Sequence, residues 1–333
     1  MTRSAVFGTG SWGTAFATIL ADAGGQVRLW GRRPELVEQI NATRANPDYL
    51  PDLHLPDAVR ATSDPAEALD RAEVLIIAVP SQTLRHSLER WCELLPPGIT
   101  MVSLMKGVEL GTTMRMSEVI AEVTGADRER IAVVSGPNLA PEIARKQPAA
   151  TVVASADAAT AEQVAAACAA PYFRPYTNSD VVGTELGGAV KNAVALAVGM
   201  AEGMGFGDNT KATIITRGLA ETARLGSALG ADPATFAGLA GVGDLIATCM
   251  SPLSRNHSFG VKLGQGMSVD EVVARTRQTA EGVKSCRSIL ELARHHDVDV
   301  PIVENVAAVV HEGRSPHDVA EALMSRPRKA ETH

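Results

Sequence analysis

The start of this 333-residue chain constrains its fold more tightly than any other stretch. A short apolar segment, residues 4–7, leads into glycines at positions 8, 10 and 13 and then into an alanine-rich helical pattern. This order predicts a strand, a tight turn and a helix, and a second strand is predicted at residues 26–30. The beginning of the chain therefore predicts parallel strands joined by a helix.

Each of these glycines has its own role in such a unit. Gly8 permits the turn, Gly10 lets the backbone approach a pyrophosphate, and Gly13 allows the helix to pack closely on the strand. The helix that follows Gly10 offers free N–H groups to an anion. A plain structural turn can show the same spacing, but its position between a strand and a helix favours binding of a dinucleotide.

Two arginines follow the second predicted strand, where NAD-binding folds usually carry a carboxylate for the ribose 2′-hydroxyl. Arg32 and Arg33 would instead match a 2′-phosphate. NADP(H) is therefore the expected cofactor, and NAD(H) is the alternative. Solvated arginines ahead of a helix that begins at Pro34 would give the same pattern.

Strand and helix patterns alternate as far as about residue 178, with further strands predicted at 73–79, 99–104, 131–135, 150–154 and 172–176. The connection 46–56 is rich in turn residues and is expected to be a surface excursion. Beyond residue 178 the pattern is helical only. We therefore predict an α/β chain with a Rossmann-type, mostly parallel sheet in residues 1–178 and an all-helical domain in residues 179–333.

Composition limits the partners of the chain. A net charge of -7 disfavours nucleic acid and anionic membranes. The N-terminus lacks a signal-peptide pattern, and no apolar run is expected to approach the length of a membrane span, so stable membrane insertion is not expected. The cysteines lack C-x-x-C spacing, which argues against a disulfide framework or a metal site and fits a reducing cytoplasm.

Two features of the helical part have the chemistry of a site. Lys191 follows the small residues 187–190, which suggests partial burial, although a lysine on a helix face is normally solvated. Ser254, Arg255 and Asn256 offer a hydroxyl, a guanidinium and an amide at a predicted helix start, a set that suits an anion. An ordinary N-cap formed by Ser254 is the simpler alternative.

Several motifs spread over the chain agree with one another. They are Gly8-Thr9-Gly10-Ser11-Trp12-Gly13, Met105-Lys106-Gly107, Ser135-Gly136-Pro137, Gly187-Gly188-Ala189-Val190-Lys191-Asn192, Gly241-Val242-Gly243-Asp244-Leu245, Thr248-Cys249, Ser254-Arg255-Asn256, Phe259-Gly260 and Ala280-Glu281-Gly282. Together they resemble the bacterial NAD(P)-dependent glycerol-3-phosphate dehydrogenase family over nearly the whole length. The resemblance implies reversible hydride transfer between NAD(P)H and dihydroxyacetone phosphate, which gives sn-glycerol 3-phosphate for phospholipid synthesis.

The resemblance also implies residue roles, with Lys191 as the proton-transfer residue. Beside the three glycines, cofactor contacts are implied for Ser11, Trp12, Arg32, Arg33, Lys106, Ala140, Arg255 and Glu281. Substrate contacts are implied for Lys106, Gly136, Asn138, Lys191, Asp244, Ser254, Arg255 and Asn256. Asn138 departs from the Ser or Thr of many members, and Thr279 from a common aliphatic residue. Asp244 and Asn192 are expected to orient the Lys191 ammonium.

Other functions stay open at this point. A related lysine-dependent reductase could act on a 3-hydroxyacid or on ketopantoate, but those relatives resemble K-x-x-N or K-x-x-x-N, whereas Lys191 and Asn192 are adjacent here. A non-catalytic NADP(H)-binding sensor would need no lysine poised for proton transfer. The expected partner is a small phosphorylated substrate, and a homodimer through helical surfaces is one assembly that the sequence leaves open.

Overall fold

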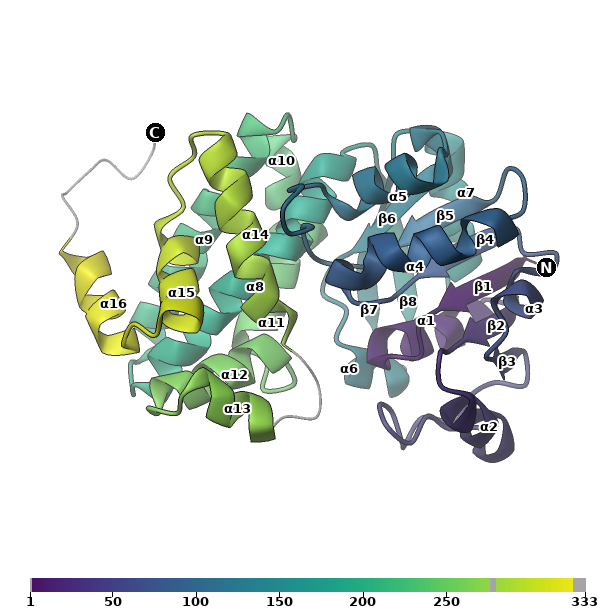
Figure 1. The fold of residues 1–333 in the computed structure, drawn as a ribbon, viewed down its shortest axis with the longest axis horizontal. Coiled ribbons are helices and arrows are strands. Elements are labelled where there is room, and N and C mark those ends of the chain that lie inside the picture. Colours follow the sequence, from purple (N-terminus) through teal and green to yellow (C-terminus); the bar gives the residue numbers. More distant parts are fainter. Residues whose placement is uncertain (1, 276–279, 326–333) are drawn as a thin grey trace.

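A computed structural model describes residues 2–275 and 280–325. Figure 1 shows two halves side by side, one built on a sheet with helices on both of its faces and the other built of helices alone. This arrangement confirms the predicted fold class. The last strand ends at Asn178 and the first helix of the helical half begins at Val181. We propose that the domain boundary lies between them, at 178/179.

The sheet has the strand order β3-β2-β1-β4-β5-β6-β7-β8. Its strands are β1 (Arg3–Phe7), β2 (Gln26–Trp30), β3 (Val59–Thr62), β4 (Val74–Ile77), β5 (Thr100–Ser103), β6 (Ile131–Ser135), β7 (Ala149–Ser155) and β8 (Phe173–Asn178). All neighbouring strands are parallel except β6 and β7. The sequence did not predict β3, because this four-residue strand includes Arg60 and Thr62 and follows a turn-rich connection.

Helices cover both faces of the sheet because successive strand residues point to opposite sides. In β1, Val6 belongs to one buried apolar cluster, and Ala5 and Phe7 belong to another. The covering helices are α1 (Ser11–Asp22), α2 (Pro34–Thr43), α3 (Pro65–Leu69), α4 (Leu84–Trp91), α5 (Met116–Thr124), α6 (Ala140–Ala144) and α7 (Ala158–Cys168). Short 3₁₀ turns, η1 (Ser81–Thr83), η2 (Cys92–Leu94) and η3 (Arg128–Arg130), complete this half.

The helical half is organised around the long helix α8. Its elements are α8 (Val181–Gly203), α9 (Asp208–Ala228), α10 (Pro233–Phe236), the π-helical turn η4 (Leu239–Gly243), α11 (Asp244–Met250), α12 (Arg255–Gly264), α13 (Val269–Arg275), α14 (Glu281–His295), α15 (Pro301–Glu312) and α16 (Pro316–Met324). A Cβ added at Gly199 of α8 would lie 2.1 Å from the His257 carbonyl oxygen of α12. These two helices therefore cross in backbone contact.

Two segments of the helical half are long and apolar enough to span a membrane, Val181–Gly203 and Pro233–Met250. The expectation that no run approaches that length is therefore wrong. In the first segment, 83% of the most apolar window is buried inside the protein, since α8 is the core helix around which the others pack. A buried core helix has the same composition as a membrane span because both are surrounded by apolar groups.

The structure of the connection 46–56 also differs from what the sequence predicted. Leu50, Leu53 and Leu55 are buried in the core of the sheet half, whereas residues 47, 48, 51, 52 and 54 are exposed, so the connection is only in part a surface excursion. Asn46 is fully buried, and its Nδ2 donates to the Thr9 carbonyl oxygen at 2.8 Å. The connection therefore supports the glycine-rich turn, a role that turn residues alone do not reveal.

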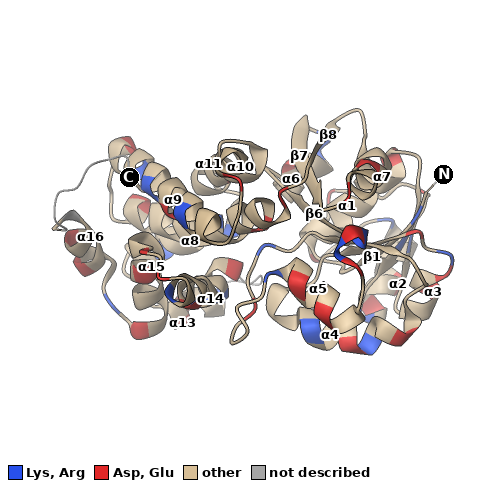
Figure 2. Cartoon of the chain, turned by 90° about the horizontal axis from the view of Figure 1, so that it is seen from above, with Lys and Arg blue, Asp and Glu red and all other residues tan. Residues whose placement is uncertain are grey.

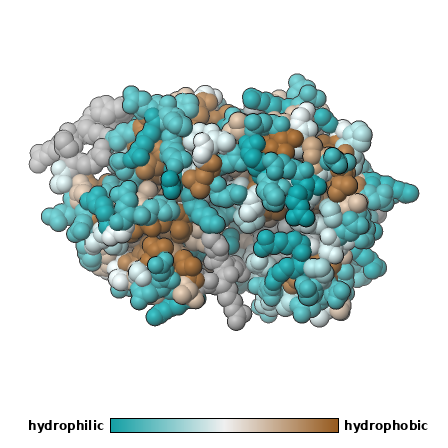
Figure 3. Space-filling view, in the orientation of Figure 1, coloured by the Kyte–Doolittle hydropathy of each residue, from teal (hydrophilic) through white to brown (hydrophobic). Residues whose placement is uncertain are grey.

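The outer surface is mixed in charge and polarity. Acidic and basic residues are interspersed over both halves in Figure 2, and hydrophilic residues cover much of the face in Figure 3, where apolar residues form separate patches.

The two halves meet at the carboxyl ends of the strands, beside α8, so charged groups that gather there come from both.

Candidate active site

The glycine-rich turn has two glycines that packing requires and one that it does not. Gly8 has φ +126°, and a Cβ there would lie 2.3 Å from the Ala78 carbonyl oxygen. A Cβ at Gly13 would lie 2.1 Å from the Gly8 carbonyl oxygen. A Cβ at Gly10 would meet nothing within 4 Å. The bare backbone at Gly10 therefore faces open space, which suits the close approach of a pyrophosphate.

The first turn of α1 also fits an anionic group. Its N-cap, Gly10, has no side chain to cap the helix, and no acidic residue lies in this turn, which includes Ser11. The Nε1 of Trp12 is buried without a hydrogen-bond partner among the described residues, while its ring packs edge-on against Phe16. Free N–H donors at a helix N-terminus attract phosphate, so this turn fits a dinucleotide.

Lys191 lies at the middle of α8 with only 7% of its surface exposed. Its Nζ donates to Asp244 Oδ1 and, at 2.7 Å, to Thr248 Oγ1. Asp244 and Thr248 lie four residues apart on α11 and so share one face of that helix. The predicted orientation of Lys191 by Asp244 agrees with this contact. The sequence motifs implied no role for Thr248, although its i+4 spacing from Asp244 places both side chains on one helix face.

Lys106 brings a second ammonium from the sheet half to the same carboxylate. It follows β5, and its Nζ donates to Asp244 Oδ2 at 2.7 Å and to the Gly136 carbonyl oxygen at 3.1 Å. A Cβ at Gly188 of α8 would lie 3.3 Å from Lys106 Cγ. The absence of a side chain at Gly188 therefore lets the lysine lie against the helix.

Asp244 is 1% exposed and accepts from both lysines, so one negative charge lies between two positive ones. Burial lowers the pKa of Lys191 to about 7. The Asp244 carboxylate opposes this change, and the charge of Lys106 adds to it. Lys191 can therefore exchange a proton near neutral pH.

Asn192 does not contact the Lys191 ammonium, contrary to the expectation. Its Nδ2 donates to the Lys106 carbonyl oxygen at 3.2 Å, and its Oδ1 accepts from Asn256 Nδ2 at 2.9 Å. Adjacent residues on a helix point about 100° apart, so neighbouring side chains do not reach the same group. Asn256 in turn accepts from the Gly282 N–H at 2.9 Å, which ties α8 and α12 to the start of α14.

The Ser254-Arg255-Asn256 run lies at the start of α12, as predicted. Ser254 is the N-cap, and its Oγ accepts from the His257 N–H at 3.2 Å. Arg255 is exposed, whereas its two neighbours are buried. Burial raises the pKa of the Glu281 carboxyl, and the charge of nearby Arg255 opposes that change. The start of α12 therefore presents Arg255 outward, beside Glu281.

The remaining predicted contacts lie at the carboxyl end of β6. Gly136 has φ +152° and supplies the carbonyl oxygen that Lys106 contacts. Asn138 Nδ2 donates to Thr151 Oγ1 at 2.8 Å, and its Oδ1 is buried without a partner in the described chain. Ala140 is buried at the start of α6. Thr279 lies outside the described residues.

Known proteins match the chain over nearly its full length. Models of the N-terminal and C-terminal parts of NAD-dependent glycerol-3-phosphate dehydrogenase match residues 3–161 and 180–321. The chain belongs to the NAD-dependent glycerol-3-phosphate dehydrogenase family. The glycerol-3-phosphate dehydrogenase [NAD(P)+] of Streptomyces coelicolor is 64% identical to this chain, with 99% of this chain and 98% of the relative covered.

Solved structures agree with this family assignment. The glycerol-3-phosphate dehydrogenase of Coxiella burnetii has a TM-score of 0.94 and 35% identity, with 98% of this chain and 99% of that chain covered. A ketopantoate reductase from Ralstonia eutropha has a TM-score of 0.60 at 17% identity over 96% of this chain and 100% of that chain, which shows a shared fold alone. The comparisons therefore favour the glycerol-3-phosphate dehydrogenase family over the alternative reductases.

In this family member, the arginines that follow β2 differ in their surroundings. Both are exposed, but Arg33 Nη2 is paired with Asp48 Oδ2 at 2.6 Å. We expect Arg32→Ala to weaken NADPH binding by about 1.5–3 kcal/mol, the loss of a charge-assisted hydrogen bond, and to leave NADH binding nearly unchanged. Arg33→Ala should cost less because Asp48 already holds this side chain. Titration of both cofactors against each variant measures this, and equal losses for NADPH and NADH would contradict it.

Proposed function

We propose that this chain catalyses the reversible, NAD(P)H-dependent reduction of dihydroxyacetone phosphate to sn-glycerol 3-phosphate, a precursor of phospholipids. The observation that carries the proposal is the buried Lys191–Asp244–Lys106 cluster, which lies where the two halves meet. Ketone reduction needs a proton donor where negative charge develops on the oxygen, and a lysine with a pKa of about 7 meets that need.

Lys191 is the group that we assign to proton transfer. In the reductive direction its ammonium gives a proton to the carbonyl oxygen of the substrate, and in the oxidative direction the neutral amine takes it back. Asp244 holds the ammonium in place and Thr248 accepts a second hydrogen bond from it. Lys106 keeps the local field positive, which stabilises the charge that develops on the oxygen.

The glycine-rich turn and the first turn of α1 would hold the dinucleotide, and Arg32 and Arg33 would face its 2′-phosphate. When bound, the nicotinamide supplies the hydride. Arg255, at the start of α12, would bind the phosphate of the substrate, where a helix N-terminus also favours an anion. The presence of Arg32 and Arg33 after β2, where NAD-binding folds usually carry a carboxylate, supports NADP(H) as the preferred cofactor, with NAD(H) also used.

The pH dependence of turnover should follow the titration of Lys191. Reduction needs the protonated lysine, so kcat for reduction should fall as pH rises through about 7. Oxidation of glycerol 3-phosphate needs the neutral amine, so its kcat should rise over the same range. Initial rates in both directions from pH 5.5 to 9, at saturating substrates, measure this; parallel profiles in the two directions would contradict the assignment.

A turnover assay distinguishes this function from the alternatives. Purified protein, NADPH and dihydroxyacetone phosphate should consume NADPH and form sn-glycerol 3-phosphate, identified by mass spectrometry. Ketopantoate and 3-ketoacids should react far more slowly. Tight NADPH binding without turnover of any of these compounds would instead indicate a sensor.

A cytoplasmic location completes the proposal, and a homodimer is one assembly that the sequence leaves open. The four cysteines are free, which suits a reducing compartment. Light scattering of the purified protein measures its mass and so tests the dimer.

A further inference from the structure

Residues 106–115, here named the arm, leave the sheet half after β5 and reach the helical half. The arm begins with Lys106, and two residues later the fully buried Val108 packs in the apolar core of the helical half. The arm ends at Arg115, whose Nη1 is paired with the buried Glu185 of α8 at 2.6 Å. Both ends of the arm are therefore anchored in the helical half.

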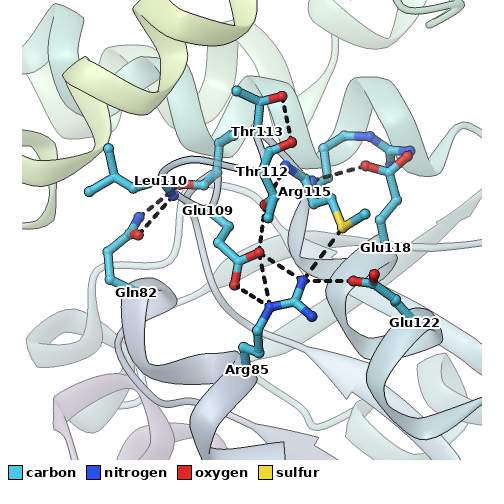
Figure 4. A network of polar contacts seen from close by, with 11 residues as sticks. Gln82, Arg85, Glu109, Leu110, Thr112, Thr113, Arg115, Glu118 and Glu122 are labelled. Atoms are coloured by element: carbon cyan, nitrogen blue, oxygen red, sulfur yellow. Dashed lines mark hydrogen bonds and ion pairs between the residues drawn. The ribbon is translucent and has the colours of Figure 1, made fainter.

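The middle of the arm is held by side chains from the sheet half, as Figure 4 shows. Arg85 of α4 forms a two-point contact with Glu109, with Nε to Oε1 at 3.0 Å and Nη2 to Oε2 at 2.9 Å. Gln82 donates to the Val108 carbonyl oxygen at 2.8 Å and accepts from the Leu110 N–H at 3.0 Å. Both contacts fix the backbone that directly follows Lys106.

The Arg85–Glu109 pair is well placed to resist movement of the arm. The Glu109 side chain is 12% exposed and that of Arg85 is 31% exposed, so water screens the pair only in part. The Arg85 guanidinium holds the pKa of the Glu109 carboxyl below its usual value against the effect of burial. A planar two-point contact also fixes direction as well as distance.

We propose that Arg85 and Glu109 are positioning residues for Lys106. They hold the arm in place, so that the Lys106 ammonium keeps its contact with the Asp244 carboxylate beside Lys191. The effects on turnover that follow from this inference rest on the proposed function, whereas the position of Lys106 does not. Lys106 is three residues from Glu109, and its Nζ contacts Asp244 at 2.7 Å. If the arm shifts by about 1 Å, a site that depends on alignment loses much of its rate.

A shift of the arm should also change the titration of Lys191. Among the described residues, the charged or titratable groups that interact electrostatically with Lys191 are Asp244, Lys106, Cys249 and Glu281. When Lys106 moves away, Lys191 loses a neighbouring positive charge and keeps more of the Asp244 carboxylate to itself. Both changes favour the protonated form, so the pKa of Lys191 should rise.

The chain offers a matched control on the same arginine. Arg85 Nη2 also contacts Glu122 Oε2 at 2.7 Å, but Glu122 lies on α5 and outside the arm. Glu109→Gln and Glu122→Gln therefore remove the same charge from the same partner. Only the first should change the position of Lys106.

The experiment compares wild type, Glu109→Gln, Glu122→Gln and Arg85→Lys. We expect Glu109→Gln to lower kcat/KM for dihydroxyacetone phosphate by about 10-fold and to move the pH midpoint of kcat upward. Glu122→Gln should change kcat/KM by less than about 2-fold, within the range of an exposed ion pair. Arg85→Lys keeps the positive charge but loses the planar two-point contact. Its kcat/KM should therefore lie between those of the two glutamine variants.

A readout without turnover separates this inference from the proposed function. The pH dependence of Lys191 acetylation by acetic anhydride, read by peptide mass spectrometry, reports its pKa directly. A higher midpoint in Glu109→Gln than in wild type and Glu122→Gln supports the inference, even if wild type does not reduce dihydroxyacetone phosphate. Equal midpoints in all variants would overturn it, as would equal kinetic losses in Glu109→Gln and Glu122→Gln. If Glu109→Gln does not fold, the pH midpoint of Lys191 acetylation is compared between Arg85→Lys and wild type, and this comparison decides.

Discussion

Replacement of Lys191 by alanine should lower kcat for dihydroxyacetone phosphate reduction by about 10²–10⁴-fold, the usual contribution of general acid catalysis. The affinity for NADPH should barely change, because the lysine lies on α8, away from the glycine-rich turn. Asp244 keeps Lys106 as its partner in this variant, so the carboxylate is not left without a counter-charge. Steady-state kinetics and NADPH titration measure the two effects separately.

Lys211→Ala is the matched control for this experiment. Lys211 lies on α9, where its Nζ pairs with Glu202 and Asp208. Because these pairs are formed near the surface, their loss should have little effect on turnover. Near-normal kcat in Lys191→Ala would remove Lys191 from the proposed mechanism, and a large loss in both variants would point to a general effect on folding.

Arg255→Ala should lower kcat/KM for dihydroxyacetone phosphate by roughly 10- to 10²-fold, which corresponds to the loss of about 1.5–3 kcal/mol of charge-assisted hydrogen bonding. In the proposed function, the phosphate bound by Arg255 would hold the carbonyl near Lys191, so kcat should fall together with the apparent affinity. For the same reason, unphosphorylated dihydroxyacetone should be a very poor substrate of the wild type.

The unphosphorylated substrate also serves as the internal control. Its residual rate should hardly change in Arg255→Ala, because the lost interaction was never formed with it. Arg287→Ala, which removes an exposed arginine of α14 that pairs with Glu291, should leave both rates unchanged. A similar proportional loss with both substrates in Arg255→Ala would show that Arg255 does not bind the phosphate. Rates are compared at saturating NADPH, because Arg255 lies near Glu281 and the family resemblance implies a cofactor contact for both residues.

The sequence by itself determined the fold class and the family. The glycine spacing, the apolar strand β4 and the loss of strand patterns after residue 178 are local signals, because alternation and turn residues act within a few positions. They predicted the alternating half and the helical half correctly. Motifs spread over the chain identified the family for the same reason, since each is a short run of residues.

Tertiary structure decided which groups meet. Lys106 and Asp244 are 138 residues apart in sequence and 2.7 Å apart in space, and no local pattern predicts that pairing. Asn192 looked like a partner of Lys191 but points to the Lys106 carbonyl oxygen, and the connection 46–56 looked exposed but buries three leucines in the core. The physical reason is that burial and charge neighbours depend on how distant elements pack. The pKa of Lys191 depends on both, so only the packed chain sets it near neutral pH.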